Sequence, residues 1–461
     1  MKRISLSGLL VISLLLSSIL VSGARPNKMI GVNVVLNTDI TNSILADLGK
    51  YGKVRDAVYA IDAVTMQARE SNLNTIRALP YVAAANPDAE VRGAPVDTVA
   101  ATDFTNGLNT WDQDAINVTD FLPGPTPDRV IGFDGSGVYV AVLDTGLADS
   151  WRQYFPQERI AEEFAIAFGG GGGNNGTVST QPNKWEHDQH THGTHVTSTI
   201  LGYSLFGTPI NGTAPKATVI PVKVLNQNGF GWESVVARGI VYVADLKANG
   251  ELGSSPVVIN MSLGGPADAM VEAAVDYAIE QGVIVVASAG NEGEEGMGYP
   301  GAYPQVISAA ASGWVGEWAP PGNFSWWFNR DVADPTNPAD FYITDFSSRE
   351  LAGQDLDVAA PGSWVVGPFQ LQSGKPSYFF LGGTSMASPH VAGIAALMMQ
   401  KNPSLTQPQV EAILESSAIP LPAGCRMVLT PFGPDPEEFC WDTDATGSGL
   451  ATADAALAAT P

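Results

Sequence analysis

Three side chains that together could break an acyl bond, Asp144, His192 and Ser385, each stand in a distinctive local sequence. Asp144 follows the apolar stretch Val138–Leu143 and precedes Thr145-Gly146, so we expect a carboxylate at a strand end where the backbone turns sharply. A carboxylate held there can orient a neighbouring imidazole. By itself the pattern is equally typical of an ordinary turn.

Four of the five histidines lie close together, at His187, His190, His192 and His195. Neighbouring imidazoles can bind zinc, but this segment has no cysteine and lacks the His-Glu-x-x-His order of a zinc-protease helix. His192 precedes a glycine at the start of an apolar helical stretch, which suits a general base that a substrate can approach. We therefore favour a base, and a metal hydrolase is the alternative.

Ser385 stands where the glycine-rich Gly382-Gly383-Thr384 gives way to a helical stretch that continues to Gln400. At a helix N-terminus, free backbone N–H groups and the helix dipole favour the negative charge that forms on a carbonyl oxygen under attack. An isolated serine at such a position is more often a helix cap. The combination of acid, base and hydroxyl favours nucleophilic catalysis.

These segments resemble the three signatures of the subtilisin-like serine proteases, the subtilases, at Asp144–Gly146, His192–Val196 and Gly383–Gly393. Further similar stretches, spread over nearly all of residues 130 to 450, are Ala214–Ala217, Val258–Gly265, Ala289–Gly293 and Ala360–Gly362. The resemblance implies that Ser385 is the nucleophile, His192 the base that removes its proton, and Asp144 the carboxylate that orients the imidazole. It also implies that the Asn291 amide and the Ser385 backbone N–H bind the oxyanion.

The same resemblance implies how substrates bind and how the chain matures. Ser262-Leu263-Gly264 and Gly229-Phe230-Gly231 would pair with the substrate backbone as added strands, which gives affinity with little sequence preference. Residues 25–98 resemble the family's inhibitory propeptide, and residues 99–461 would form the peptidase unit. We expect self-cleavage within Gly93–Asn106, whose Ala, Pro, Asp and Thr without periodicity are typical of a linker.

Two departures from the family concern metal binding. Leu201–Thr213 lacks the Asn-rich calcium loop of well-known members, and Gln153 stands where those members carry an Asp ligand. Catalysis by a hydroxyl and an imidazole requires no cofactor, and structural calcium is left open. A catalytically silent surface or binding protein that retains the fold is the second alternative, because a fold alone does not establish activity.

The elements that must position the site are Val- and Ile-rich strands that alternate with helices. We expect strands over 137–143, 218–224, 256–261 and 283–288, and helices over 192–201, 233–248 and 267–281. Continuous apolar strands between helices predict an α/β fold with a parallel sheet covered by helices on both faces. Functional residues should then lie at the carboxyl ends of the strands.

The region before this sheet predicts a small, separate α+β unit. Strands are expected over 30–36, 57–64 and 81–85, with one helix ending near Gly49 and another over 71–79. Two helices on one face of such a sheet form a split βαβ, ferredoxin-like arrangement. Its other face would be free to cover the peptidase unit.

The composition and the N-terminal sequence indicate where the protein is located and which classes of molecule it binds. A net charge of −24, from 23 Lys and Arg against 47 Asp and Glu, argues against nucleic acid or anionic membrane as a partner. Residues 1–24 combine a basic start, an apolar run and a small-residue end, which predicts a cleaved signal peptide and a secreted, extracellular product without a membrane span. We expect a monomer whose partners are protein and peptide substrates and its own propeptide.

The two cysteines, Cys425 and Cys440, are the last feature that the sequence singles out. An oxidising destination favours a disulfide between them over two free thiols. The tryptophan-rich insert over 314–342 has no assigned role, and aromatic loops of this kind more often pack on their own domain than bind substrate.

Overall fold

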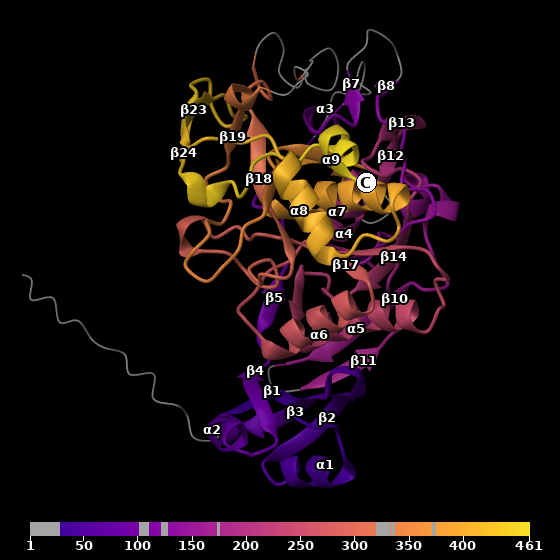
Figure 1. Ribbon diagram of the computed structural model, residues 1–461, viewed down its shortest axis with the longest axis vertical. Helices are drawn as coiled ribbons and strands as arrows, with labels where there is room; N and C mark the ends of the chain where they lie inside the picture. The colour runs from indigo at the N-terminus through magenta and orange to yellow at the C-terminus, as the bar shows by residue number, and fades with distance from the viewer. Residues whose placement is uncertain are drawn as a thin grey trace, which may run out of the picture.

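The computed structural model describes residues 28–100, 110–120, 128–172, 176–319, 332, 337–370 and 375–461. A small unit, in indigo in Figure 1, precedes a larger α/β unit, and residues 88–100 connect the two. The expected signal peptide lies outside the described residues. None of the helices in the described part is long and apolar enough to cross a membrane.

The N-terminal unit is an antiparallel sheet with the strand order β2-β3-β1-β4, which is the ferredoxin-like arrangement. Both helices contribute to one apolar core against one face of this sheet, because Leu48 and Ile76 pack with Val32, Val34 and Met66. The elements are β1 (Met29–Leu36), α1 (Asn42–Leu48), β2 (Gly52–Val58), β3 (Ala63–Arg69), α2 (Leu73–Arg77) and β4 (Val82–Pro87).

The single strand expected over 57–64 is wrong, because the chain makes a hairpin there. Strand β2 ends at Val58, a short 3-10 turn covers Tyr59–Ile61, and Asp62 adopts a left-handed conformation with φ 45° before β3 begins at Ala63. Apolar residues on both sides of this turn give the sequence the pattern of one continuous strand.

The larger unit is built on a sheet in the order β11-β10-β14-β9-β16-β17-β18-β19, with β20 also paired to β18. All pairs are parallel except the two outermost, β10 with β11 and β18 with β19. The α/β fold predicted from sequence is therefore confirmed. The strands are β9 (Tyr139–Asp144), β10 (Ile166–Gly171), β11 (Thr177–Thr180), β14 (Thr218–Lys223), β16 (Val257–Met261), β17 (Val283–Ser288), β18 (Ile307–Trp314), β19 (Phe341–Ile343) and β20 (Val358–Pro361).

Helices cover both faces of this sheet (Figure 1). Alternate residues of the central strands β9, β16 and β17 pack on opposite sides. On β9, Val140 and Val142 pack in the core that contains α4 and α7, whereas Ala141 and Leu143 pack in the core that contains α5 and α6. The helices are α3 (Trp111–Ala115), α4 (His192–Leu201), α5 (Glu233–Ala248), α6 (Ala269–Glu280), α7 (Thr384–Lys401), α8 (Gln407–Ser417) and α9 (Ala453–Ala459).

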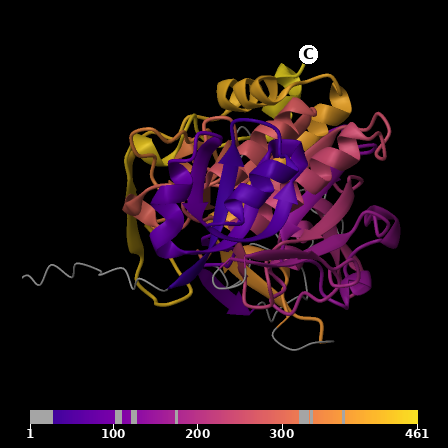
Figure 2. The same cartoon turned by 90° about the horizontal axis from the view of Figure 1, so that it is seen from below.

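The N-terminal unit covers the side of the larger unit formed by α5, α6 and β11, and Figure 2 shows it in front of the larger unit in the view from below. Val58 and Ala63 belong to the apolar core under α5 and α6. Thr65 donates to the Met270 sulfur at 3.7 Å, and Arg238 forms an ion pair with Asp56 at 3.5 Å. The interface thus continues the core of the larger unit.

The described part of the expected linker is not free, because it pairs with the larger unit at two places. Strand β5 (Glu90–Arg92) pairs antiparallel with β15 (Phe230–Trp232). Strand β6 (Asp97–Ala100) pairs antiparallel with β22 (Tyr378–Gly382), which also pairs with β21 (Val365–Pro368). Residues 101–109 lie outside the described residues.

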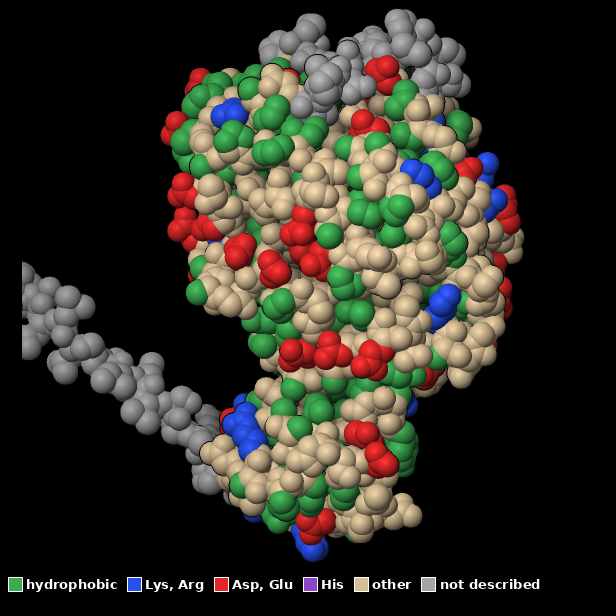
Figure 3. Space-filling view, viewed as in Figure 1, with side chains coloured by type: hydrophobic (Ala, Val, Ile, Leu, Met, Phe, Trp, Pro, Cys, Tyr) green, Lys and Arg blue, Asp and Glu red, His purple; other side chains and the backbone are tan. Residues whose placement is uncertain are grey.

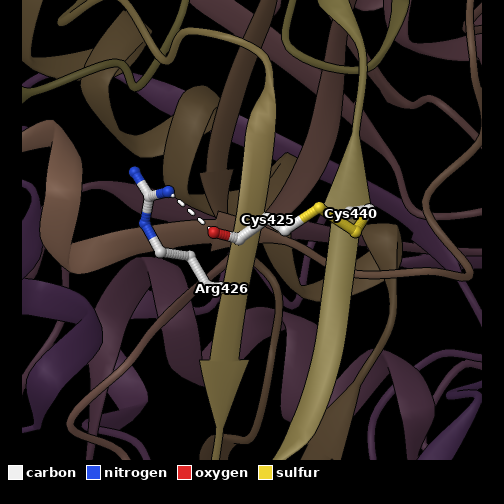
Figure 4. Close-up of a disulfide and its surroundings, with 3 residues drawn as sticks. All are labelled: Cys425, Arg426 and Cys440. Atoms are coloured by element: carbon white, nitrogen blue, oxygen red, sulfur yellow. Dashed lines mark hydrogen bonds between the residues drawn. A yellow bond between two sulfur atoms is a disulfide. The ribbon is translucent and has the colours of Figure 1, made fainter.

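The cysteine prediction is confirmed at a C-terminal hairpin of β23 (Gly424–Val428) and β24 (Glu437–Trp441), where Cys425 lies opposite Cys440 in the register and the two form a disulfide (Figure 4). The Arg426 guanidinium packs over the Trp441 ring, 5.3 Å from the ring centroid. The disulfide therefore closes a loop of 15 residues on the surface.

Shorter elements complete the described chain. They are β7 (Thr119–Asp120), β8 (Asp128–Arg129), β12 (Gly202–Leu205) and β13 (Thr208–Asn211). In the aromatic insert, Trp318 packs edge-on against Trp364 and Phe380, each at 5.5 Å between ring centroids. This part of the insert therefore packs on its own domain, as expected. Acidic side chains are more widespread than basic ones on the face shown in Figure 3.

Candidate active site

Asp144 is the last residue of β9 and is fully buried. Its carboxylate accepts from the Thr145 backbone N–H at 2.6 Å and faces the His192 Nδ1 at 2.9 and 3.0 Å. The turn that follows needs Gly146, because φ is +89° and a Cβ there would overlap the Trp185 carbonyl oxygen. The sequence Asp-Thr-Gly thus fixes a buried acid against one edge of the imidazole.

His192 is the first residue of α4, directly after Thr191 in a left-handed conformation with φ 63°. The Gly193 backbone N–H donates to the Thr145 hydroxyl at 2.8 Å, so the turns that carry the acid and the base are bonded to each other. The His192 Nε2 is buried and has no hydrogen-bond partner among the described residues. This nitrogen is the atom that could take a proton.

Ser385 lies in the first turn of α7, where backbone N–H groups have no partner within the helix. Its hydroxyl donates to the Ser262 carbonyl oxygen at 3.3 Å, and the Ser262 hydroxyl donates back to the Ser385 carbonyl oxygen at 2.8 Å. A hydrogen bond from Ser385 to His192, which the sequence led us to expect, is not formed in this conformation. Catalytic hydrogen bonds of this kind often tighten only when substrate binds.

Gly93 of the connecting segment nevertheless lies close both to the imidazole and to the oxygen that Ser385 contacts. A Cβ placed on Gly93 would lie 3.5 Å from the His192 Cε1 and 2.8 Å from the same Ser262 oxygen that Ser385 contacts. Acid, base and hydroxyl are therefore brought to one end of the sheet from three distant parts of the chain.

The Asn291 carboxamide is oriented by the residue before the serine. Its Oδ1 accepts from the Thr384 backbone N–H and from the Thr384 hydroxyl, both at 2.9 Å. This leaves the amide Nδ2 as the free donor of the group, and Asn291 lines a cavity together with Ser385 and Gly290. The arrangement can offer a side-chain donor and a backbone donor to one carbonyl oxygen.

The two segments expected to bind substrate are both occupied by the connecting segment. Arg92 and Gly264 exchange backbone hydrogen bonds at 2.9 and 2.8 Å, and Gly93 donates to the Gly229 carbonyl oxygen at 2.9 Å. Gly231 lies opposite Val91 in the β5–β15 register. Leu263 is buried and its carbonyl accepts from Ser288 at 3.2 Å, so it supports the segment.

The histidines do not gather into a metal site within the described part of the chain. His195 is fully buried and its Nε2 contacts the Val365 carbonyl oxygen at 3.2 Å, and burial lowers its pKa to about 3. Burial also lowers the pKa of His190 to about 4, and its ring lies 6.0 Å from that of His192. Among the residues that the structure describes, the one group with metal-ligand spacing is Cys425, Glu438 and Cys440, whose sulfurs form the disulfide.

The stretch that lacks the calcium loop of well-known subtilases folds as the β12–β13 hairpin. Gln153 ends a short 3-10 turn over Trp151–Gln153.

Sequence reasoning missed a cluster of buried carboxyl groups between the two units, formed by Asp88, Glu233 and Asp268. Asn33 on β1 donates to Asp88 at 3.3 Å and to Asp268 at 3.2 Å. Asp88 also accepts from the Ser234 hydroxyl at 2.6 Å. Asp268 was recognisable as the cap of α6, but the meeting of the three groups depends on how the units pack and has no local signal.

Burial dominates the electrostatics of this carboxyl cluster. It raises the pKa of Asp88 to about 6 and that of Glu233 to about 9, with the charge of Asp268 adding to the effect on Glu233. Burial raises the pKa of Asp268 as well. Among the residues that the structure describes, the Glu233 Oε1 has no hydrogen-bond donor, so its contact with the Asp268 carboxylate becomes a hydrogen bond only when one of the two carries a proton. The docked form therefore retains protons that exposed carboxyl groups would lose.

Relatives of known sequence match more than half of the chain. Subtilisin E of Bacillus subtilis (strain 168) is 34% identical over 294 residues, which cover 62% of this chain and 62% of that protein. M-protease of Shouchella clausii (strain KSM-K16) is 34% identical over 328 residues, 70% of this chain and 65% of that protein. The chain thus spans less than two thirds of the length of these relatives.

Two solved structures are also similar. Fervidolysin from Fervidobacterium pennivorans, a keratinolytic enzyme related to subtilisin, matches with a TM-score of 0.63 at 23% identity over 94% of this chain and 61% of its own, which shows a common fold. Sphericase matches with a TM-score of 0.52 at 28% identity over 76% of this chain and 99% of its own. The model of the subtilase family matches residues 135–453, which hold the acid, the base and the serine, and the chain belongs to that family.

Proposed function

We propose that the chain is a secreted serine endopeptidase that hydrolyses peptide bonds through an acyl-enzyme on Ser385. The observation that carries this proposal is the buried pair of Asp144 and His192, 2.9 Å apart, with the second imidazole nitrogen unpartnered at the end of the sheet that also holds Ser385. The names of the relatives, subtilisin E and M-protease, support a protease.

In the proposed reaction, Asp144 holds the Nδ1–H of His192, which leaves Nε2 to take the Ser385 proton. The serine Oγ attacks the substrate carbonyl carbon, and the Ser385 N–H and the Asn291 amide bind the oxyanion. His192 then gives the proton to the leaving amine. Water then attacks the ester carbonyl carbon. His192 takes the proton of this water and returns a proton to the Ser385 oxygen as the ester bond breaks.

Substrates would bind as an extended strand between Gly229–Gly231 and Ser262–Gly264. Both segments contact the connecting segment through backbone groups, and such contacts do not depend on side-chain identity. Broad specificity towards proteins and peptides follows. The mature enzyme would act as a monomer.

We also propose that residues 25–98 are an inhibitory propeptide removed by self-cleavage near residue 98. Support comes from the connecting segment, which pairs with both expected substrate segments and lies next to His192 at Gly93. A substrate cannot enter while that segment stays in place. Export by the signal sequence over 1–24 would precede this step.

A catalytically silent binding protein is the second candidate, and the absence of a Ser385–His192 hydrogen bond in this conformation is the observation that favours it. In that case the connecting segment would be a permanent part of the structure.

Casein digestion by the purified protein tests the proposal, with labelling by a serine-reactive phosphonate as a second measurement. We expect digestion, loss of digestion after labelling, and an intact, unlabelled precursor for Ser385→Ala. Ser416→Ala, at an exposed serine on α8, is the matched control and should mature and be labelled normally. A Ser385→Ala preparation that matures by itself, or a phosphonate-insensitive activity, would contradict the mechanism.

A further inference from the structure

The connecting segment is held on both sides of the site in one defined register. Before the site, Arg92 pairs with Gly264 and the Gly93 N–H donates to Gly229. After the site, the Val96 N–H donates to the Gly382 carbonyl oxygen at 2.7 Å, three residues before Ser385. The segment therefore crosses the site and is anchored to the larger unit on both sides of it.

This register determines which bond lies at the serine. Gly93 faces the imidazole of His192, as described above, and the Pro95 Cα lies 3.7 Å from the position that a Cβ on Gly383 would take. Ala94 and Pro95 line the same cavity as Ser385 and Asn291. Three carbonyl groups, those of Gly93, Ala94 and Pro95, lie between the anchored N–H groups of Gly93 and Val96. The Gly93 oxygen lies beside Gly229, 2.6 Å from the position that a Cβ there would take. The middle carbonyl belongs to Ala94, so we infer that the bond presented to the serine is Ala94–Pro95.

Proline is well suited to binding at this position. Its ring fixes φ near −65°, and it restricts the preceding residue to extended conformations, which are those of a strand. Proline has no backbone N–H, and at position 95 none is required, because the donor on this side of the site is Val96.

Proline is poorly suited to cleavage at the same position. Cleavage forms the bond between Ser385 Oγ and the Ala94 carbonyl carbon, breaks the bond from that carbon to the Pro95 nitrogen, and passes the serine proton through His192 Nε2 to that nitrogen. The proline ring places Cδ where another residue would carry hydrogen. The ring thus crowds the approach of His192 and restricts the nitrogen as it becomes tetrahedral.

We propose that Pro95 is a specificity-determining residue that prevents cleavage of the bond docked at Ser385 and directs the maturation cut to a different bond. The inference rests on the proposed function. The docked register is then an inhibited one, and the segment must shift or another molecule must cut it before the cleft opens.

The test follows the full precursor over time for wild type, Pro95→Ala and Val96→Ala. Val96→Ala is the matched control, since it changes the next, exposed side chain and keeps the N–H that bonds Gly382. Mass spectrometry of the products gives the new N-terminus. We expect wild type and Val96→Ala to be cut at bonds other than Ala94–Pro95, and Pro95→Ala to gain a product that begins at residue 95 and to lose intact precursor at least about 10-fold faster.

A second measurement does not depend on folding of the variant precursor. Synthetic peptides covering residues 88–98, with Pro95 or with alanine in its place, are given to mature wild-type enzyme, and only the alanine peptide should be cut after Ala94. A wild-type product that begins at Pro95, or alanine forms that are not cut after Ala94, would overturn the inference.

The outcomes separate this inference from the proposed function. Casein digestion with no effect of Pro95→Ala in either measurement would refute the role of Pro95 alone. Precursors that all stay intact, together with undigested casein, would refute both.

Discussion

The carboxyl cluster between the two units predicts that the N-terminal unit is released by rising pH once the precursor has been cut. In the docked state, burial holds the pKa of Glu233 at about 9, against an ordinary value of 4.5. After release, Glu233 and Asp268 would be exposed to water at the N-termini of α5 and α6, where the helix dipole favours their charged forms. The released state then binds fewer protons than the docked state between these two values.

The sign and the size of the effect follow from this difference in bound protons. Docking is strongest below about pH 4.5 and weakens as the pH rises towards 9, because each dissociation releases a proton in this range. One proton gives up to about 10-fold in the dissociation constant per pH unit, or ~1.4 kcal/mol. Keeping Glu233 neutral at pH 7 would cost about 3 kcal/mol of docking free energy, which raises the dissociation constant of the N-terminal unit a few hundred-fold relative to low pH.

The titratable groups that face Glu233 come from the neighbouring parts of the chain. They are Asp88 from the connecting segment, Asp268 at the start of α6, and Tyr303, whose hydroxyl bonds the backbone of Asp268 at 2.9 and 3.0 Å. Asp88, with a pKa of about 6, should add a second, smaller release of protons. Glu233→Gln removes one titrating group and keeps the shape of the side chain.

The assay uses the self-processed complex, diluted to a series of concentrations between pH 5 and 8. Hydrolysis of a small fluorogenic peptide reports the free enzyme, as a fraction of the activity of fully dissociated enzyme at the same pH. We expect a dissociation constant that rises with pH in wild type, and a tighter complex with a shallower pH slope in Glu233→Gln. Glu272→Gln, at an exposed glutamate on α6, is the control and should follow wild type. A wild-type constant that does not change with pH, or equal slopes in the two proteins, would refute the reasoning.

Three further predictions concern the site and the C-terminal hairpin. Asn291→Ala should lower kcat by about 10²- to 10³-fold with little change in KM, the size known for loss of such a donor in subtilisin, and steady-state kinetics on a peptide will show a smaller loss if the amide does not bind the oxyanion. Asp144→Asn should lower kcat by roughly 10⁴-fold, because the amide favours the wrong tautomer of His192, and an activity near wild type would remove Asp144 from the mechanism. Cys425→Ser combined with Cys440→Ser should lower the free energy of unfolding by about 3 kcal/mol, measured by denaturant titration against the oxidised protein, and an unchanged midpoint would show that the loop gains nothing from its closure.

Elements and residues whose signal lies within a few neighbouring positions could be predicted from the sequence. The helices that begin at His192 and at Glu233 have the expected bounds, because their apolar periodicity and their flanking turns agree. Asp144 was predictable as a strand-end acid for the same reason, since it follows an unbroken apolar strand and precedes a glycine turn. Cys425 and Cys440 were the only possible partners for each other.

Features that depend on contacts between distant segments could not be predicted. The stretch after Arg92 has the composition of a linker, yet Asp97–Ala100 forms a strand, because the unpaired edge of β22 supplies its hydrogen bonds. The partner of the Ser385 hydroxyl in this conformation, the carbonyl of Ser262, likewise depends on tertiary packing. The raised pKa values of the carboxyl groups around Asp268 arise only when two folded units exclude water from one another.

The two anchors of the connecting segment, at Gly264 before the serine and at Gly382 after it, have a consequence for timing. Cleavage near residue 98 would free neither new end, because the residues before the cut stay hydrogen-bonded to Gly264 and those after it stay paired with β22. The chain can thus be cleaved and still inactive, with a lag between cleavage and the first hydrolysis of substrate. The rate at which the hydrogen-bonded ends dissociate, rather than the rate of cleavage, would then determine the length of the lag.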